Sequence, residues 1–211
     1  MKISYLESVD STQNYLKELV REGSIELPHA VVADMQTDGI GSRGNSWSGI
    51  RGNLFLSFAI RIKDLPSDLK LESSSIYFAY IMKESLAELN SRVWLKWPND
   101  FYIDELKIGG MITNVVKESV ICGVGLNLVI APEGFGALDI AVSREELLKK
   151  YFKNIENHTT WKQVFSKYEL EFPKSKNFST HTDNIKISLA EATLQSDGSI
   201  ISNSKRIFSL R

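Results

Sequence analysis

Cysteine is nearly absent from this sequence: Cys122 is the only one among 211 residues. A single cysteine cannot form an intramolecular disulfide, which excludes a disulfide-stapled secreted framework and favours the reducing cytoplasm. Long apolar runs are also missing, since none approaches the roughly 18 residues of a membrane span. Near the N-terminus, Glu7 interrupts any apolar stretch that could serve as a signal peptide. We therefore expect a cytoplasmic protein that is neither exported nor inserted in a membrane.

An excess of either charge is lacking as well. Lys and Arg total 25 against 26 Asp and Glu, for a formal net charge of -1. Without a basic surplus, nucleic-acid binding is not expected as the main task. The three histidines, His29, His158 and His181, are too dispersed for a metal site or a catalytic triad. The hydrophobic content of 43% and the length suit one substantial domain with a sizeable core.

The spacing of apolar residues predicts alternating blocks of helix and strand. Helices are expected over 11–22, 69–90, 143–152 and 159–172, and strands over 29–34, 53–62, 93–97, 107–116 and 120–128. The order is mixed, which predicts an α+β fold with a mixed central sheet backed by helices on one face. Pro173 and the polar run 174–184 predict a linker between a main domain, 1–175, and a small C-terminal β domain, 182–211. That domain is too short to fold alone and must dock on the first.

A Gly-rich loop follows the strand at 29–34. Its segment 39–44, Gly-Ile-Gly-Ser-Arg-Gly, matches the G-x-G-x-x-G pattern of dinucleotide-binding loops. That mechanism needs a helix to begin there, yet the sequence continues as loop, so we do not favour it. The backbone N–H groups, the guanidinium of Arg43 and the indole of Trp47 suit a lid over an anionic, partly aromatic ligand. A mobile surface loop with a tucked-in tryptophan is the alternative.

The run Lys96-Trp97-Pro98-Asn99-Asp100 gathers a cation, an indole, an amide and a carboxylate after a strand. Proline lacks an N–H and ends the strand ladder, so Asn99 and Asp100 are expected at a turn where they can face a ligand or a metal ion. An Asx turn, with these side chains bonding their own backbone, is an equally good interpretation.

Two further strands carry small residues beside a polar group. Lys107 precedes Gly109 and Gly110, where bare backbone permits close approach of a ligand, although a solvated lysine before a glycine bulge would look the same. The segment 123–127, Gly-Val-Gly-Leu-Asn, places Asn127 in an apolar strand, where it is either a structural tie or a reader of a polar ligand group. Cys122 is expected in the core, because nothing nearby supplies a general base.

Taken together, these motifs resemble those of the biotin protein ligases. The matching elements are Ser11-Thr12-Gln13-Asn14, Gln36 with the Gly-rich loop, the run 96–100, the run 107–110 and the run 123–127, in the family's order and spacing. The resemblance covers nearly the whole chain, and the K-W-P-N-D run followed by K-x-G-G is its most specific part. The segment 197–211 resembles a shortened form of the family's small SH3-like C-terminal β domain.

The resemblance implies the α+β fold shared with class II aminoacyl-tRNA synthetases and an ATP-dependent reaction in two steps. Biotin and Mg-ATP would give biotinyl-5'-AMP, and a lysine of a biotin carboxyl carrier protein, as in acetyl-CoA carboxylase, would then receive the biotinyl group. The implied substrates and cofactors are ATP, Mg²⁺ and biotin. The implied assembly is a monomer or a homodimer.

The resemblance also implies roles for individual residues. Lys107, Asp100 and Arg43 would be catalytic, with Asp100 as the candidate base for the acceptor lysine and a metal ligand. The biotin site would be formed by Ser11, Thr12, Gln36, Gly39, Lys107, Gly109, Gly110 and Gly125. The ATP and adenylate site would be formed by Arg43, Trp47, Lys96, Asn99, Asp100 and Asn127.

The sequence departs from the family pattern at three places. Ile40, Ser42 and Asn45 stand where arginine is common, which leaves Arg43 alone and predicts a leakier lid over the adenylate. Gln13 follows Thr12 where the family usually has asparagine, and on that ground we leave Gln13 out of the predicted site. The motifs begin about ten residues from Met1, so the N-terminal winged helix of the family's repressors is not expected, nor is DNA binding.

Two other functions remain as alternatives. A lipoate or octanoate transferase would use a related fold but lacks the K-W-P-N-D run. A catalytically dead sensor that binds biotin or adenylate would explain the missing arginines, although the presence of Lys107 and Asp100 argues against it.

Overall fold

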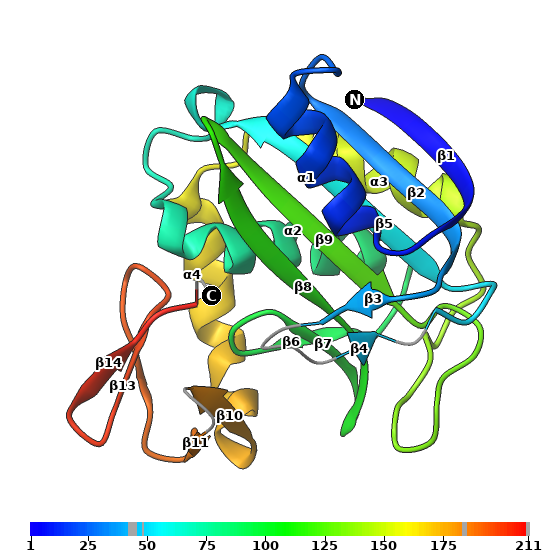
Figure 1. Ribbon diagram of the computed structural model, residues 1–211. Helices are drawn as coiled ribbons and strands as arrows, with labels where there is room; N and C mark the ends of the chain where they lie inside the picture. The colour runs from blue at the N-terminus through cyan, green and yellow to red at the C-terminus, as the bar shows by residue number, and fades with distance from the viewer. Residues whose placement is uncertain (42–45, 48, 183–184, 210–211) are drawn as a thin grey trace.

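A seven-stranded sheet forms the centre of the protein (Figure 1), in a computed structural model that describes residues 1–41, 46–47, 49–182 and 185–209. The strand order is β1-β2-β5-β9-β8-β7-β6. The bounds of these strands are β1 Lys2–Val9, β2 His29–Gln36, β5 Leu54–Arg61, β6 Trp94–Lys96, β7 Asp100–Ile103, β8 Leu106–Val116 and β9 Ser119–Leu126. β1 pairs with β2 in parallel and the other neighbours pair antiparallel, which confirms the predicted mixed sheet.

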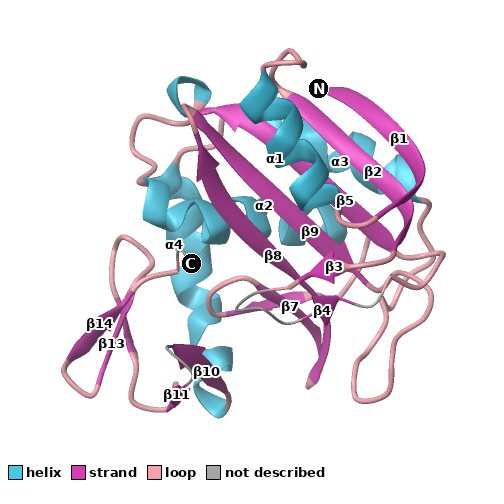
Figure 2. Cartoon of the chain, viewed as in Figure 1, coloured by secondary structure: helices cyan, strands magenta, loops and turns pink. Residues whose placement is uncertain are grey.

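Helices cover both faces of this sheet (Figure 2), whereas the sequence predicted helices on one face only. α1 (Thr12–Glu22) packs Leu16 and Val20 against one face. α2 (Ser74–Ala87), α3 (Arg144–Glu156) and α4 (Trp161–Glu171) cover the opposite face. The one-face prediction was wrong because it overlooked the crossover between the parallel strands β1 and β2. α1 forms this crossover, and it packs on the face of the sheet opposite to α2, α3 and α4.

Local chemistry fixes where α1 begins and ends. The Ser11 side chain accepts a hydrogen bond from the backbone N–H of Asn14, as an N-cap does. Gly23 ends the helix with a φ of 72°, a left-handed conformation that favours glycine. The predicted helix over 11–22 is therefore confirmed, and its first turn faces the sheet where β2 and β5 run side by side.

Other predicted elements are confirmed with shifted bounds. The helix predicted over 69–90 is a 3₁₀ turn, Leu71–Ser73, followed by α2. β1 and β7 were missed, because β1 alternates weakly and β7 has only four residues, Asp100–Ile103. The Gly-rich loop contains a short hairpin, β3 (Gly39–Ile40) with β4 (Ser46–Trp47), where a dinucleotide-binding fold would have a helix.

The predicted linker after Pro173 was also wrong. Residues Phe172–Asn177 form a 3₁₀ helix with Pro173 in its first turn, a place where proline is tolerated. Ser175 is fully buried and its hydroxyl accepts a hydrogen bond from the backbone N–H of Trp97 at 3.0 Å. This segment is thereby fixed to the end of β6.

Short strands follow in the C-terminal region, as predicted. β10 (Ser179–Thr182) pairs with β11 (Ile185–Ser188), and β12 (Thr193–Leu194), β13 (Ile200–Ser202) and β14 (Lys205–Ile207) form a three-stranded sheet. Four side chains of this C-terminal region, Leu189, Ala192, Ile200 and Ile207, are buried in the main hydrophobic core. The predicted docking of the C-terminal strands on the rest of the protein is therefore confirmed.

Among the described residues, every helix falls short of the length and apolar content that crossing a membrane requires.

Candidate active site

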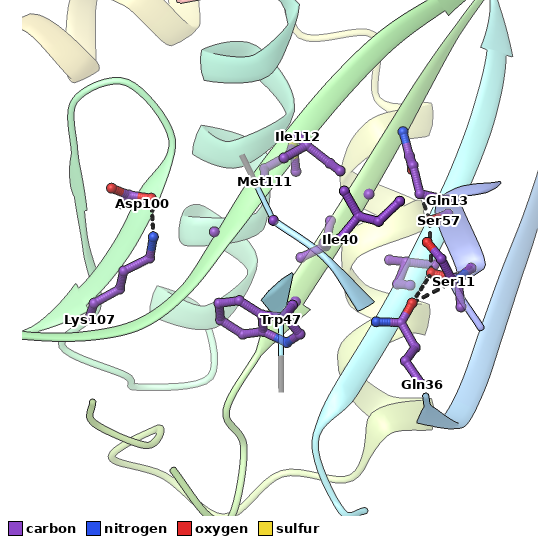
Figure 3. Close-up of a pocket in the computed structure, with 17 residues that line it drawn as sticks. Ser11, Gln13, Gln36, Ile40, Trp47, Ser57, Asp100, Lys107, Met111 and Ile112 are labelled. Atoms are coloured by element: carbon purple, nitrogen blue, oxygen red, sulfur yellow. Dashed lines mark hydrogen bonds and ion pairs between the residues drawn. The ribbon is translucent and has the colours of Figure 1, made fainter. Parts of the chain in front are cut away.

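A cavity lies on the face of the sheet that also carries α1 (Figure 3). Its walls come from the first turn of α1, the middle of β5, β8 and β9, and the hairpin β3–β4. The lining residues are Ser11, Thr12, Gln13, Gln36, Ile40, Gly41, Trp47, Leu56, Ser57, Asp100, Lys107, Gly110, Met111, Ile112, Gly123, Val124 and Gly125. We call it the site cavity.

One end of the site cavity is a network of hydroxyl and amide groups. Gln36 Oε1 accepts from the backbone N–H of Thr12 at 2.8 Å and from the Thr12 hydroxyl at 2.9 Å. The Thr12 hydroxyl also lies 3.0 Å from Ser57 Oγ, and Ser57 donates to Gln13 Oε1 at 2.9 Å. Thr12, Gln13 and Ser57 are all buried. This end can hold a compact polar group that both accepts and donates hydrogen bonds.

The middle of the site cavity is apolar. Ile40 and Trp47 of the Gly-rich hairpin lie over the sheet, and Ile112 of β8 lines the cavity with them, whereas the side chain of Met111 belongs to the core on the opposite face (Figure 3). The indole of Trp47 rests on bare backbone, since a Cβ on Gly125 would come within 2.5 Å of it. Trp47 Nε1 is buried and has no hydrogen-bond partner within the described residues. An aliphatic chain would fit between these side chains.

The other end of the site cavity holds a cluster of opposite charges. Lys107 Nζ lies 2.7 Å from Asp100 Oδ1, and Lys96 Nζ lies 3.2 Å from Asp100 Oδ2. Burial alone would raise the pKa of the Asp100 carboxyl, but the two ammonium groups outweigh burial and hold this pKa below its ordinary value. One carboxylate faces two ammonium groups, so the cluster carries a net positive charge. Such an end attracts anions.

The cluster has room for a ligand because Gly110 stands beside it. A Cβ on Gly110 would lie 3.2 Å from Asp100 Oδ1 and 3.6 Å from Lys107 Nζ. A side chain there would crowd the cluster and fill the space in front of Lys107. The predicted close approach of a ligand to bare backbone is therefore possible at Gly110.

A second cavity adjoins the charged end. It shares Asp100 and Lys107 with the site cavity and is also lined by Lys96 and Asn99. Lys17 of α1 and residues 179–181 of β10 contribute to its walls. The charged cluster therefore stands between two spaces, where groups bound in each of them can meet.

Most of the predicted site residues come together around these two cavities. The site cavity is lined by eight of them: Ser11, Thr12, Gln36, Trp47, Asp100, Lys107, Gly110 and Gly125. Lys96 and Asn99 line the second cavity. Asn99 forms no Asx turn with its own side chain: its amide donates to the carbonyl of Met111 at 2.7 Å, which ties the β6–β7 turn to β8. Arg43 lies outside the described residues.

Three predicted residues lie outside the cavity walls. A Cβ on Gly109 would lie 2.4 Å from Leu126 Cδ2, so this glycine makes room within the sheet. Gly39 instead leaves space for the Gln36 amide, because a Cβ on Gly39 would lie 2.8 Å from Gln36 Nε2. Asn127 donates to the carbonyl of Gly136 at 3.1 Å. The sequence left two roles open for Asn127, a structural tie or a reader of a ligand group, and this contact is that of a structural tie.

Sequence reasoning missed Gln13 and Ser57. Gln13 was set aside because it departs from the family pattern, yet it is 3% exposed and lines the site cavity. Ser57 is a hydroxyl in the otherwise apolar strand Leu54–Arg61, where it is fully buried. Buried polar groups need partners, so a lone polar residue in an apolar strand was the available signal.

The described residues do not fit a metal ion held by the protein. They contain no group of three or more His, Cys, Asp and Glu side chains that could hold one. Both oxygens of Asp100 are engaged by ammonium groups. The predicted role of Asp100 as a metal ligand therefore gains no support from its surroundings.

Comparison with known proteins gives a consistent result. Residues 5–127, more than half of the chain, match the model of the biotin/lipoate A/B protein ligase family. Among curated proteins, the bifunctional ligase/repressor BirA of Escherichia coli is 30% identical over 135 residues, which cover 61% of this chain and 41% of the relative. This chain thus spans about two fifths of that relative's length.

Solved structures show the likeness over nearly the full chain. The biotin acetyl coenzyme A carboxylase synthetase of Helicobacter pylori, solved with biotinylated ATP, has a TM-score of 0.94 and 40% identity, covering 98% of this chain and 99% of that one. The biotin protein ligase of Aquifex aeolicus, solved with biotin and ATP, has a TM-score of 0.78 and 25% identity, covering 100% and 96%.

Proposed function

Because the chain belongs to the biotin/lipoate A/B protein ligase family, we propose that it is an ATP-dependent biotin protein ligase. The observation that carries this proposal is the sequence of environments along the site cavity: a hydroxyl and amide network, an apolar middle and a net positive end. Biotin has a ureido ring, an aliphatic chain and a terminal carboxylate in the same order. The likeness to structures solved with biotin and ATP supports the same conclusion.

The first step joins biotin to the nucleotide at the charged cluster. A carboxylate oxygen of biotin attacks the α-phosphorus of ATP, the bond from that phosphorus to the bridging oxygen breaks, and pyrophosphate leaves. Lys107 lies between the two cavities and can neutralise charge on both the carboxylate and the phosphate. Mg²⁺ would enter with the nucleotide, as part of the substrate.

Asp100 has a different part in this proposal from the base predicted by the sequence. A carboxylate whose pKa is held low by two ammonium groups is ionised at neutral pH and is a weak proton acceptor. Its contacts with Lys107 and Lys96 instead hold both ammonium groups at the junction of the cavities. We infer that Asp100 orients the cationic groups.

The second step transfers the biotinyl group to a lysine of a biotin carboxyl carrier domain. The neutral amine attacks the acyl carbon, the bond from that carbon to the phosphate oxygen of AMP breaks, AMP leaves with the electron pair, and the amine nitrogen loses one proton to solvent. The second cavity provides the approach, because Asp100 and Lys107 line it while the residues of the hydroxyl and amide network do not. A reaction that consumes ATP supports a cytoplasmic location.

We also propose that residues 1–175 form the catalytic domain and 182–211 a small β domain docked upon it. Ser209 lines the second cavity, so the C-terminal strands stand next to the reaction centre. Their buried side chains Leu189 and Ile200 join the core of the catalytic domain.

Exchange of labelled pyrophosphate into ATP tests the function without requiring the carrier. Purified protein with Mg²⁺ should catalyse exchange with biotin but not with lipoate or octanoate. Exchange with lipoate or octanoate alone would replace the proposal by the alternative transferase. Biotin binding without any exchange would point to a sensor.

A further inference from the structure

The side-chain amide of Gln13 is held on three sides. Ser57 donates to Gln13 Oε1 at 2.9 Å, and Gln13 Nε2 donates to Asn114 Oδ1 at 3.1 Å and to the carbonyl of Ile121 at 3.2 Å. Asn114 and Ile121 face each other across β8 and β9. The amide is therefore fixed between the helix that carries it and two strands of the sheet.

These partners decide which way the amide points. A backbone carbonyl can only accept, so the nitrogen of the Gln13 amide faces Ile121 and the oxygen faces Ser57. Ser57 has one hydrogen, and it is directed at Gln13. Toward Thr12, 3.0 Å away, Ser57 Oγ can then only accept.

The direction of that hydrogen sets the polarity of the cavity wall. The single hydroxyl hydrogen of Thr12 is shared between two acceptors, Ser57 Oγ and Gln36 Oε1. Neither of these atoms returns a hydrogen to Thr12 Oγ1, so lone pairs of Thr12 remain for a ligand. The wall at this end of the site cavity therefore favours a ligand that brings N–H groups.

Gln13 also limits the depth of the site cavity. A Cβ on Gly123 would come within 2.6 Å of Gln13 Oε1, so the amide occupies the space above this glycine. Gln13 lines the site cavity together with Gly123. A shorter side chain at position 13 would leave that space open to the ligand.

We propose that Gln13 is the specificity-determining residue of the ring-binding end, selecting a compact ring with N–H groups, such as a cyclic urea, over a disulfide ring or an alkyl end. It acts by holding the hydrogen of Ser57 and by filling the space above Gly123. This inference rests on the proposed function and assigns a role to a residue that departs from the family's usual sequence.

The test compares Gln13→Met, which keeps the length of the side chain but removes its amide, with the unaltered protein. We measure the KM for biotin in pyrophosphate exchange and the inhibition constants of lipoate and octanoate against it. The KM for biotin should rise about tenfold, as expected for the loss of an ordered hydrogen-bond network. The kcat should stay within about twofold, and so should both inhibition constants, because those acids offer no N–H at this end.

Gln13→Asn and Gln195→Met serve as controls. Gln13→Asn keeps the amide on a shorter chain, and is expected to weaken the selectivity less than Gln13→Met. Gln195→Met makes the same exchange at a residue that lies outside both cavities and bonds to the carbonyl of Thr193, and should leave every constant unchanged.

The possible failures are distinguishable. If the KM for biotin and both inhibition constants rise together in Gln13→Met, or if none changes, Gln13 does not determine specificity and this inference is overturned. If the unaltered protein shows no exchange with biotin, the proposed function itself fails and the inference fails with it.

Discussion

Lys107 Nζ lies 2.7 Å from Asp100 Oδ1, and this ion pair closes one end of the site cavity. The second oxygen of Asp100 is held by Lys96 at 3.2 Å. The carboxylate thus balances one of two ammonium charges and positions both. In the reaction proposed above, which joins a carboxylate to a phosphate, the remaining positive charge would stabilise the anionic transition state.

Replacing Lys107 should therefore disable the first step. In Lys107→Ala the kcat of biotin-dependent pyrophosphate exchange is expected to fall about 100-fold or more, the usual effect of losing a preorganised electrostatic contact. Lys63→Ala, which removes an exposed lysine from the turn Ile62–Asp64, is the matched control and should retain full activity. Exchange within tenfold of normal in Lys107→Ala would remove Lys107 from the catalytic centre.

The ionisation of Asp100 predicts how its contribution to stability depends on pH. Lys107 and Lys96 hold the folded-state pKa of Asp100 below its value in the unfolded chain, which is about 3.9. The stabilisation is therefore complete at neutral pH and is lost as the pH falls through the folded-state pKa. Urea denaturation should show Asp100→Asn to be less stable than the unaltered protein at pH 7, with the difference shrinking below about pH 4.

The same variant distinguishes the orienting role of Asp100 from a role as base. If Asp100 orients Lys107, Asp100→Asn should lower both adenylate formation and transfer to the carrier. A base for the acceptor amine would affect transfer alone. Normal exchange combined with slow transfer in Asp100→Asn would restore the assignment that the sequence suggested.

Much of the fold was predictable because local signals and packing agree. The caps Ser11 and Gly23 and the apolar spacing between them specify α1 without reference to the rest of the chain. β7 was missed, since its four residues become a strand by pairing with β6 and β8. The segment after Pro173 was read as a linker because its burial comes from the contact of Ser175 with Trp97, which is distant in sequence.

The candidate site shows a similar division. Lys107 and Asp100 were predictable because their motif is compact and lies on adjacent strands. Gly109 and Gly110 looked equivalent in sequence, yet alternate residues of a strand point to opposite faces, and Gly110 is the one beside the cavity. The role of Gln13 depends on Asn114 and Ile121, about one hundred residues away, which no local pattern reveals.

The contact between Trp47 and Gly125 predicts a defect in the apolar middle of the site cavity. In Gly125→Ala the new Cβ would meet the indole at 2.5 Å, so the ring must move. Because Trp47 lines the part of the site cavity that would hold the aliphatic chain of biotin, the KM for biotin should rise about tenfold, which corresponds to the free energy of one aromatic contact. A double-mutant cycle with Trp47→Ala checks the cause: the two effects should not add if both act through the indole. Additive effects would show that Gly125 acts independently.

Docking of the C-terminal strands predicts a loss of stability at Gly198. Its carbonyl accepts from Trp97 Nε1 at 2.8 Å, and its φ of 77° favours glycine. A Cβ there would come within 2.7 Å of Ile76 Cδ1 and 3.2 Å of Trp161, both in the main hydrophobic core. Gly134 offers a matched control, because it has a similar φ of 80° and a Cβ added there would meet nothing within 4 Å. In urea denaturation, Gly198→Ala should lower the free energy of unfolding by about 1–3 kcal/mol more than Gly134→Ala does, because overpacking adds to the backbone strain that both share. If both variants lose the same free energy of unfolding, the strands at 193–207 can move away from the core without destabilising the protein. Their docking would then contribute nothing to the stability of the rest of the chain.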